Sequence, residues 1–344
     1  ESKTPVQLAN LFRDTKSTKL SISSEYGGDN LNANELKDVL IWTGSRCPSL
    51  SVMKIMHHHT TASLNSVAEF LPDNAMVVQM IAEANLLIAS AFAEGDETRA
   101  HYTTSKMKIS KNDSGYIIQG SKKPCTMTNV MDMVLTGINY TDKNGDTHIG
   151  SALIDANDDN LKRKQFWNAT YLKSSDSNEL IFDNVLVPDS QINLESEIQD
   201  ALASRNINSA EDIVMMWLQL LTSSAYFGMV IALITPVLIK KSGSIDDRAK
   251  LIIEMESIYS KIESISNLIE TKKFTRESLY KTTALRMSIQ SSIDICADLA
   301  FELSGGINFI KDDLPSYLFC ACRAIKFHPP FRTESLTEIV DGLS

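Results

Sequence analysis

The sequence has few cysteines, no internal repeat and no recognisable export signal. Its 344 residues include five cysteines, an odd number without a CxxC spacing, so a disulfide framework is not expected. Thiols of this kind fit a reducing compartment. The first five residues lack a basic segment followed by an apolar core, so no signal peptide is expected. Together these absences predict a cytoplasmic protein.

Positive charge is also scarce. The net charge is -10, whereas a protein that binds nucleic acid over its whole surface is usually basic. The most apolar run, residues 213–239, is long enough to span a membrane. Polar residues and Pro236 interrupt this run, which favours a helix buried in a large bundle. We therefore expect neither nucleic acid nor a membrane as a partner.

The hydrophobic pattern changes its period twice along the chain and so divides it into three segments. With 43% hydrophobic residues, the chain can bury a large core. Residues 1–88 carry apolar residues at three- and four-residue spacing, which predicts an N-terminal α-helical domain. Its helices are expected at 31–43, 51–70 and 76–91.

Residues 89–195 show short runs of alternating apolar and polar residues instead. Turn signals at 112–115 and 142–146 separate them. This spacing predicts a middle antiparallel β domain, either a small barrel or a sandwich. The strands are expected at 102–109, 116–120, 134–140, 147–154 and 179–187.

Helical periodicity returns in residues 196–344. Gly305 and Gly306 break the pattern before the last helix, and two prolines end that helix. Four long helices with short links predict a C-terminal four-helix bundle domain. The helices are expected at 209–241, 246–272, 275–303 and 314–327.

Six short strings, in this order and at this spacing, resemble the acyl-CoA dehydrogenase family over almost the whole chain. Residues 115–122, for example, are close to the family's G-Y-x-L-N-G-x-K. The resemblance implies the acyl-CoA dehydrogenase fold, of the α+β class, with FAD as cofactor. The strings are residues 24–28, 91–95, 115–122, 125–126, 182–188 and 302–306, and Arg323 follows at about the family distance.

The resemblance also implies positions for residues around the flavin. Thr126 would lie beside N5, and the backbone of Phe92, Ala93 and Cys125 would line the ring, where donors stabilise the reduced state. The glycines Gly305 and Gly306 would let the backbone approach the dinucleotide of a neighbouring subunit, which implies a homodimer or homotetramer. The plainer alternatives are a strand threonine and a helix C-cap.

The departures from the family pattern concern the catalytic base. Nine residues after Arg323 the family has a glutamate, but here that residue is Arg332. The alternative glutamate, ten residues before Gly228, is replaced by Leu218. Only a gap in the alignment would bring Glu334 into the site. Removing the weakly acidic α-proton of a thioester needs a well-placed carboxylate, so ordinary desaturation is disfavoured.

A substrate that already carries oxygen avoids this problem. A hydrated aldehyde can send hydride to N5 while its O–H proton goes to water or to His328. The strings at 56–60, 92–95 and 327–330 resemble the biosynthetic branch of the family, and most closely the aminomalonyl-carrier-protein dehydrogenases of colibactin-type pathways. We therefore expect FAD-dependent oxidation of aminomalonate semialdehyde to the aminomalonyl thioester in polyketide or nonribosomal peptide biosynthesis.

Such a substrate would arrive on the phosphopantetheine arm of an acyl carrier protein, which is usually acidic. Three basic clusters are candidates for docking this carrier protein: residues 162–164, 240–241, and 272–273 with Arg276. Each cluster is also compatible with ordinary solvated surface charge. Two other functions stay open. The chain could be an ordinary acyl-CoA α,β-dehydrogenase that uses Glu334, or a degenerate, non-catalytic scaffold homologue.

The three consecutive histidines His57, His58 and His59 suggest a metal site at first sight. Adjacent residues of a helix point about 100° apart, so three in a row do not converge on one ion. We expect no metal.

Overall fold

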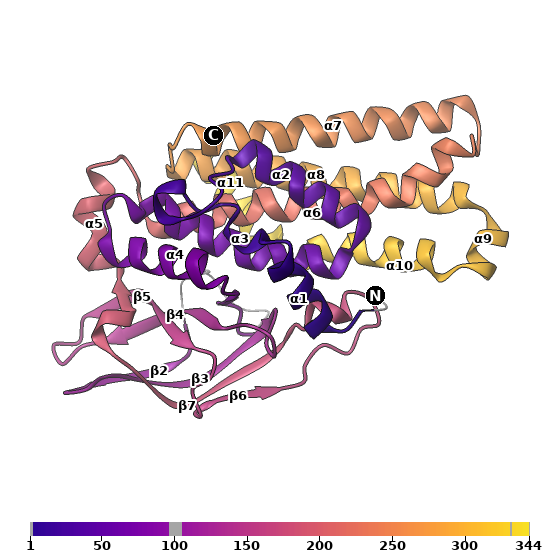
Figure 1. The fold of residues 1–344 in the computed structure, drawn as a ribbon. Coiled ribbons are helices and arrows are strands. Elements are labelled where there is room, and N and C mark those ends of the chain that lie inside the picture. The colour runs from indigo at the N-terminus through magenta and orange to yellow at the C-terminus, as the bar shows by residue number, and fades with distance from the viewer. Residues whose placement is uncertain (1–2, 96–104, 331, 344) are drawn as a thin grey trace. The chain divides into compact units, whose positions relative to one another are not determined.

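The computed structural model describes residues 3–95, 105–330 and 332–343, without the side chains of 332–334 and 338. Its contacts separate the chain into two compact units. The β-containing unit comprises Ser2–Leu31 and Met56–Val214, and the helical unit comprises Asn32–Ile55 and Met215–Ser344. Two long helices, α3 and α6, have residues in both units (Figure 1).

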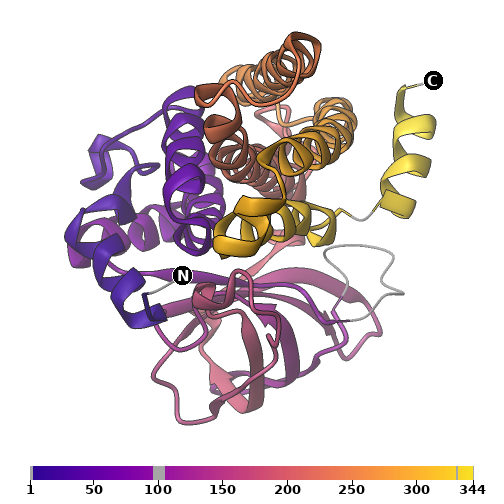
Figure 2. The same ribbon diagram turned by 90° about the vertical axis from the view of Figure 1, so that its right-hand side faces the viewer.

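The helical unit is built around three long helices, which Figure 2 views nearly end-on. The capping box of Ser244 and Asp247 starts α7, and Gly305, with φ +79°, ends α8. The helices of this unit are α2 (Ala33–Arg46), the start of α3 (Pro48–Ala68), most of α6 (Ala210–Ile239), α7 (Ile245–Glu270), α8 (Arg276–Ser304), α9 (Gly306–Lys311), α10 (Asp313–Cys322) and α11 (Arg332–Leu343), with a 3₁₀ turn at Arg323–Phe327.

Two glycines allow α2 and α6 to pack with their backbones in contact. A Cβ on Gly44 would lie 2.1 Å from the carbonyl oxygen of Ala225, and one on Gly228 would lie 2.1 Å from that of Ile41. No larger residue fits at either position without moving a helix. Gly228 thus has a packing role.

Helix α6 is the described helix that is long and apolar enough to cross a membrane by length and composition. Of the most apolar stretch of 18 residues in this helix, 67% is buried inside the protein. This burial is typical of a core helix, as the polar interruptions in the sequence suggest.

The β-containing unit combines short helices with two four-stranded sheets. The capping box of Thr4 and Gln7 starts its first helix. Its helices are α1 (Pro5–Asp14), the rest of α3, α4 (Pro72–Ala84) and α5 (Glu195–Ala203), with 3₁₀ turns at Ser17–Lys19, Ser24–Tyr26, Lys173–Ser175 and Asp189–Gln191. Its strands are β1 (Ile88–Ala91), β2 (Lys108–Asn112), β3 (Gly115–Cys125), β4 (Met133–Thr141), β5 (Thr147–Asp155), β6 (Leu161–Lys164), β7 (Asn178–Val187) and β8 (Ile192–Leu194).

The strand orders are β1-β4-β5-β8 and β2-β3-β7-β6. All described pairs are antiparallel except β1 with β4, which is parallel and sets Ile88 opposite Met133. The register of β3 against β7 shifts between Lys122 and Cys125, directly before Thr126. The end of β3 is therefore bent where the resemblance places the flavin-contacting residues.

The unit's apolar core joins the helices to the first sheet. It includes Leu64 of α3, Val78 and Ile81 of α4, Leu135 of β4 and Leu153 of β5. This cluster fixes α3 and α4 against the sheet and so forms one wall of the cavity described below.

The structure corrects several predicted elements. Residues 88–91, expected at the end of a helix, form strand β1, because Asn85 ends α4 in the left-handed conformation with φ 55°. The last expected helix, 314–327, is α10 followed by a 3₁₀ turn. Of the strand expected at 102–109, residues 102–104 lie outside the described residues. The sequence reasoning missed α1, α5, α9, α11 and three short strands, β1, β6 and β8.

Candidate active site

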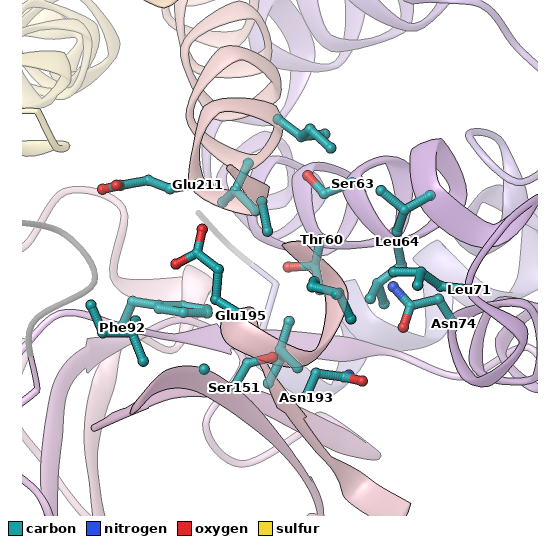
Figure 3. Close-up of a pocket in the computed structure, with 18 of the residues that line it drawn as sticks. Thr60, Ser63, Leu64, Leu71, Asn74, Phe92, Ser151, Asn193, Glu195 and Glu211 are labelled. Atoms are coloured by element: carbon teal, nitrogen blue, oxygen red, sulfur yellow. The ribbon is translucent and has the colours of Figure 1, made fainter. Parts of the chain in front are cut away.

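The β-containing unit holds a cavity of about 120 Å³ (Figure 3). Helices α3 and α4, strands β4, β5 and β8, and the first turns of α5 and α6 surround it. Its wall is mostly apolar and includes Leu64, Val67, Leu71, Phe92, Leu135 and Ile213. Polar groups also reach it, among them Thr60, Ser63, Asn74, Ser151, Glu195 and Glu211.

Two glycines shape this cavity. The ring of Phe92 lies over Gly137 of β4, where an added Cβ would be 2.8 Å from Cδ1 of the ring. Gly150 of β5 lies against β8, where an added Cβ would be 2.2 Å from the carbonyl oxygen of Asn193. Side chains at these positions would move the Phe92 ring or separate the two strands.

Glu195 brings a negative charge to this apolar wall. It is the first residue of α5, directly after β8, and it is half-buried. In Figure 3 its carboxylate points toward the first turn of α6, on the side where Glu211 lies, and Thr60 lies on the other side of it. Within the described residues, no hydrogen bond or ion pair satisfies this carboxylate. Glu211, the other carboxylate on the wall, does interact with another group of the chain.

Thr60 and Ser63 lie on the cavity side of α3, three residues apart. The Thr60 hydroxyl donates to the carbonyl oxygen of Met56 at 3.0 Å. The Ser63 hydroxyl donates to that of His59 at 2.6 Å. Each hydroxyl has one proton. The hydroxyl oxygens of Thr60 and Ser63 can therefore act only as hydrogen-bond acceptors toward a ligand in the cavity.

Near the bend of β3, the structure brings the flavin-binding candidates of this unit together. The Lys123 amide donates to the carbonyl oxygen of Ala93 at 2.8 Å, so the segment after Phe92 runs beside the segment that ends in Cys125 and Thr126. Burial raises the pKa of the Cys125 thiol to about 12. Cys125 is therefore a neutral packing residue whose side chain is not a nucleophile.

Thr126 begins a chain of three hydroxyl groups. Ser175 donates to the carbonyl oxygen of Leu172 at 2.7 Å, so Ser177 must donate to Ser175 at 2.9 Å. Thr126, 2.9 Å from Ser177, must then donate to Ser177. The free lone pairs of Thr126 can accept a further hydrogen bond.

A buried ion pair fixes the segment after β1 that carries Phe92 and Ala93. Nζ of Lys122 lies 2.6 Å from Oε1 of Glu94, and the Ser105 hydroxyl and the Lys106 amide also donate to this oxygen. Burial alone would raise the pKa of Glu94, but the hydrogen bond and charge of Lys122 outweigh it, so the pKa is lowered. Glu94 is therefore ionised and engaged by the protein itself.

The three histidines of α3 have different surroundings, although the rings of His57 and His58 lie 5.0 Å apart and both contact Phe12. Nε2 of His57 lies 2.6 Å from the carbonyl oxygen of Thr18, and the Ile88 amide donates to Nδ1 at 3.2 Å, which defines a neutral ring with its proton on Nε2. His58 packs edge-on against Phe12, whereas His59 lines the cavity. Within the described residues, no group of three or more His, Cys, Asp or Glu could hold a metal ion.

The remaining candidates lie in the helical unit. Gly305 and Gly306 have no atom within 4 Å of an added Cβ, and Gly305 is the C-cap of α8, as its plainer interpretation predicts.

Nε2 of His328 lies 2.8 Å from the Tyr226 hydroxyl. Burial, helped by the charge of Arg286, lowers the pKa of His328 to about 3. The side chain of Glu334 lies outside the described residues, so its role stays a prediction.

The basic cluster 162–164 is largely engaged by the protein. Lys162 pairs with Asp183, Lys164 lies 3.7 Å from Glu179, and Arg163 donates to three backbone carbonyls. Exposed pairs of this kind contribute little stability, but they reduce the charge offered to a partner. Lys240, Lys241, Lys272 and Lys273 are exposed.

A search of curated proteins finds a relative along nearly the whole chain. Isobutylamine N-hydroxylase of Streptomyces viridifaciens is 30% identical over 338 residues, which are 97% of this chain and 88% of the relative. The chain belongs to the family of this N-hydroxylase. No family model matches the sequence.

Solved structures with the same fold agree with this relationship. The nitrososynthase of Micromonospora carbonacea var. africana has a TM-score of 0.82 at 13% identity and covers 99% of this chain and 90% of its own. FMN-bound TdsC of Paenibacillus sp. A11-2 has a TM-score of 0.83 at 15% identity and covers 97% and 89%. The acyl-CoA dehydrogenase fold expected from the sequence is confirmed.

Membership in the N-hydroxylase family supports an oxidoreductase, as expected, without supporting a dehydrogenase. The structure of TdsC contains FMN, and FAD as the cofactor of this chain stays a prediction. The sequence reasoning missed Glu195, Thr60, Ser63 and Ser177. A signal was present for Thr60 and Ser63, which are one helical turn apart in a predicted helix, but not for Glu195, because the strand and the helix that flank it were themselves missed.

Proposed function

We propose that this chain is a flavin-dependent monooxygenase that hydroxylates the nitrogen of a small amine. The observation that carries the proposal is its 30% identity with isobutylamine N-hydroxylase over 338 residues. That alignment is long enough to include most of the cavity and the hydroxyl chain of Thr126. The reaction would use one O₂ and two electrons from the reduced flavin, and it would yield a hydroxylamine and one water.

The size of the cavity supports a small substrate. A cavity of about 150 Å³ in another protein holds benzene, which has six non-hydrogen atoms. The cavity here, about 120 Å³, would by the same proportion take about five. A four-carbon amine has this size, and the apolar wall of Leu64, Val67 and Leu71 suits its alkyl part.

The residues near the end of β3 fit a reduced flavin. When bound, the flavin would supply two electrons and activate oxygen. A reduced flavin carries a proton on N5, and the lone pairs of Thr126 can accept a hydrogen bond from that N–H because Ser177 takes the Thr126 proton. Glu94 and Lys122 hold the neighbouring segment of Phe92 and Ala93 in place. The buried thiol of Cys125 would remain inert.

The cavity residues have three tasks in this reaction. The apolar wall excludes water, so that the activated oxygen meets the amine instead of being lost to solvent. Phe92, which lines the cavity next to the flavin-binding candidate Ala93, connects the two parts of the site. The polar groups of the cavity orient the substrate nitrogen.

Oxidation of a carrier-bound aminomalonate semialdehyde with FAD stays the second proposal, on the resemblance to the biosynthetic branch. A homodimer or homotetramer and a cytoplasmic location also remain proposals. An arm-borne substrate would place only its tip in a cavity of about 120 Å³. The charge pairing of Lys162 and Lys164 leaves the exposed lysines of the helical unit as the docking candidates.

The test is turnover with reduced flavin. The full chain, oxygen and isobutylamine are mixed with FMN or FAD that a flavin reductase keeps reduced, and the products are analysed by mass spectrometry. A product with one added oxygen atom on nitrogen is expected, and ¹⁸O₂ should label it. No oxygenated product, together with anaerobic bleaching of oxidised flavin by a carrier-bound substrate or by butyryl-CoA, would instead establish a dehydrogenase.

A further inference from the structure

The cavity offers a polar ligand several acceptors. Glu195 is half-buried on an apolar wall and has no protein partner within the described residues. The oxygens of Thr60 and Ser63 have given their protons to carbonyl groups of α3. A ligand that binds any of these groups must therefore be a hydrogen-bond donor. An ammonium group, with three N–H donors and no acceptor, matches this set.

The start of helix α5 explains only in part why a carboxylate occupies position 195. A carboxylate in the first turn of a helix is stabilised by the helix dipole, typically by less than about 1 kcal/mol. Glu197, in the same turn of α5, serves that purpose from an exposed position. Withdrawing a charge from water without a partner is unfavourable. The position of Glu195 in the cavity is thus better explained by a cationic ligand.

We propose that Glu195 binds the ammonium group of the substrate and then takes one of its protons. This inference rests on the proposed function and names the residue that selects an amine. The proton moves from R–NH₃⁺ to the carboxylate, which leaves R–NH₂ and a neutral carboxylic acid. The nitrogen lone pair is then free to form the N–O bond. As it forms, the O–O bond breaks, and the second oxygen leaves as water with two electrons supplied by the reduced flavin.

The arrangement predicts discrimination by charge. Isobutylamine and isobutanol have the same carbon skeleton, but only the amine is cationic near neutral pH. Leu64, Val67 and Leu71 would hold either skeleton equally well. Glu195 should therefore favour the amine, whereas a carboxylic acid of the same size should be repelled.

The experiment measures binding of isobutylamine and of isobutanol by calorimetry, with the full flavin-loaded chain under anaerobic conditions. We expect Glu195→Gln to weaken amine binding by about 10- to 100-fold, the usual loss for a hydrogen bond to a charged group. The affinity for isobutanol should change by less than about threefold, because a neutral ligand loses no charge interaction. Glu197→Gln, the matched control in the same helical turn, should bind both ligands as the wild type does.

Folding and function can be separated in the same series. Glu195→Asp keeps the charge and should recover part of the amine affinity, which a merely structural role would not predict. Circular dichroism of each variant checks the fold. Equal amine affinity in Glu195→Gln and wild type would overturn the inference, as would equal affinity of the wild type for amine and alcohol.

Turnover distinguishes this inference from the proposed function. If the wild type binds amine through Glu195 but forms no hydroxylamine with reduced flavin and oxygen, the monooxygenase proposal fails while the ammonium site stands. If Glu195→Gln forms hydroxylamine with an unchanged KM, the monooxygenase proposal stands and the role of Glu195 is refuted.

Discussion

The helical unit buries a charged side chain completely and the β-containing unit buries one in part, and the two side chains differ in their contacts. Arg286 in the helical unit is 1% exposed, and its two terminal nitrogens donate to the carbonyls of Ile325, His328 and Pro330. Glu195 in the β-containing unit lines a cavity without a protein partner within the described residues. The first charge is used to hold the chain, and the second is available to a ligand.

This difference separates structural from functional polar groups. His328 belongs to the cluster of Arg286: its carbonyl accepts from Arg286, and its ring bonds the Tyr226 hydroxyl. Such a ring, with a pKa near 3, is a weak base at neutral pH. Its place in the sequence resembled a catalytic position, but its contacts are those of a residue that fixes a turn.

Replacing Arg286 with alanine should have the largest effect, which we expect on the stability of the protein. The three carbonyls would lose their buried donor, and we expect a loss of about 3 to 5 kcal/mol in the free energy of unfolding. Arg248→Ala is the matched control, because Arg248, in the first turn of α7, also donates to three carbonyls, which belong to the more exposed segment 241–243. Its loss should stay below about 1 kcal/mol. Denaturant unfolding of both variants measures these losses. Equal losses in the two variants would contradict the structural role assigned to Arg286.

His328→Phe should have a moderate effect that depends on pH. The buried Tyr226 hydroxyl loses its partner, which should cost about 1 to 3 kcal/mol at neutral pH. Because the pKa of His328 is lowered from 6.5 to about 3, the unfolded chain binds its proton first as the pH falls. The wild type should therefore lose stability below about pH 6.5, and the variant should lose less.

Unfolding curves between pH 7 and 4 check this expectation. The pH profile of turnover between 5 and 8 should keep its shape in the variant. A profile that loses a limb would show instead that His328 acts as a base, as the sequence suggested.

Ser151→Val should have the smallest effect and should act on the cavity alone. Ser151 lies on β5 at the cavity wall, and valine suits a strand while it adds volume. We expect binding of isobutylamine to weaken by about tenfold, and binding of the smaller methylamine to change much less. Calorimetry with the two amines decides this, and an equal change for both would show that Ser151 does not limit the cavity.

Much of the architecture could be read from local patterns. The helical periodicity at 31–43, 51–70, 209–241, 246–272 and 275–303, and the break at Gly305, correspond to helices and a helix end that the structure has. Short strands were harder to predict from the sequence. Strands β1, β6 and β8 have only three or four residues, and their pairing with distant strands stabilises them. The overrun of the expected helix into residues 88–91 has the same cause.

The sequence by itself determined the order of helical and β segments and the family resemblance, because these depend on local periodicity and spacing. Only the tertiary structure decided which polar groups are satisfied. Glu195 lies on α5, whereas Thr60 and Ser63 lie on α3, and nothing in the local sequence shows that one cavity lies between these two helices. A charge is functional or structural according to its neighbours in space, because only those neighbours can replace the water it loses on burial.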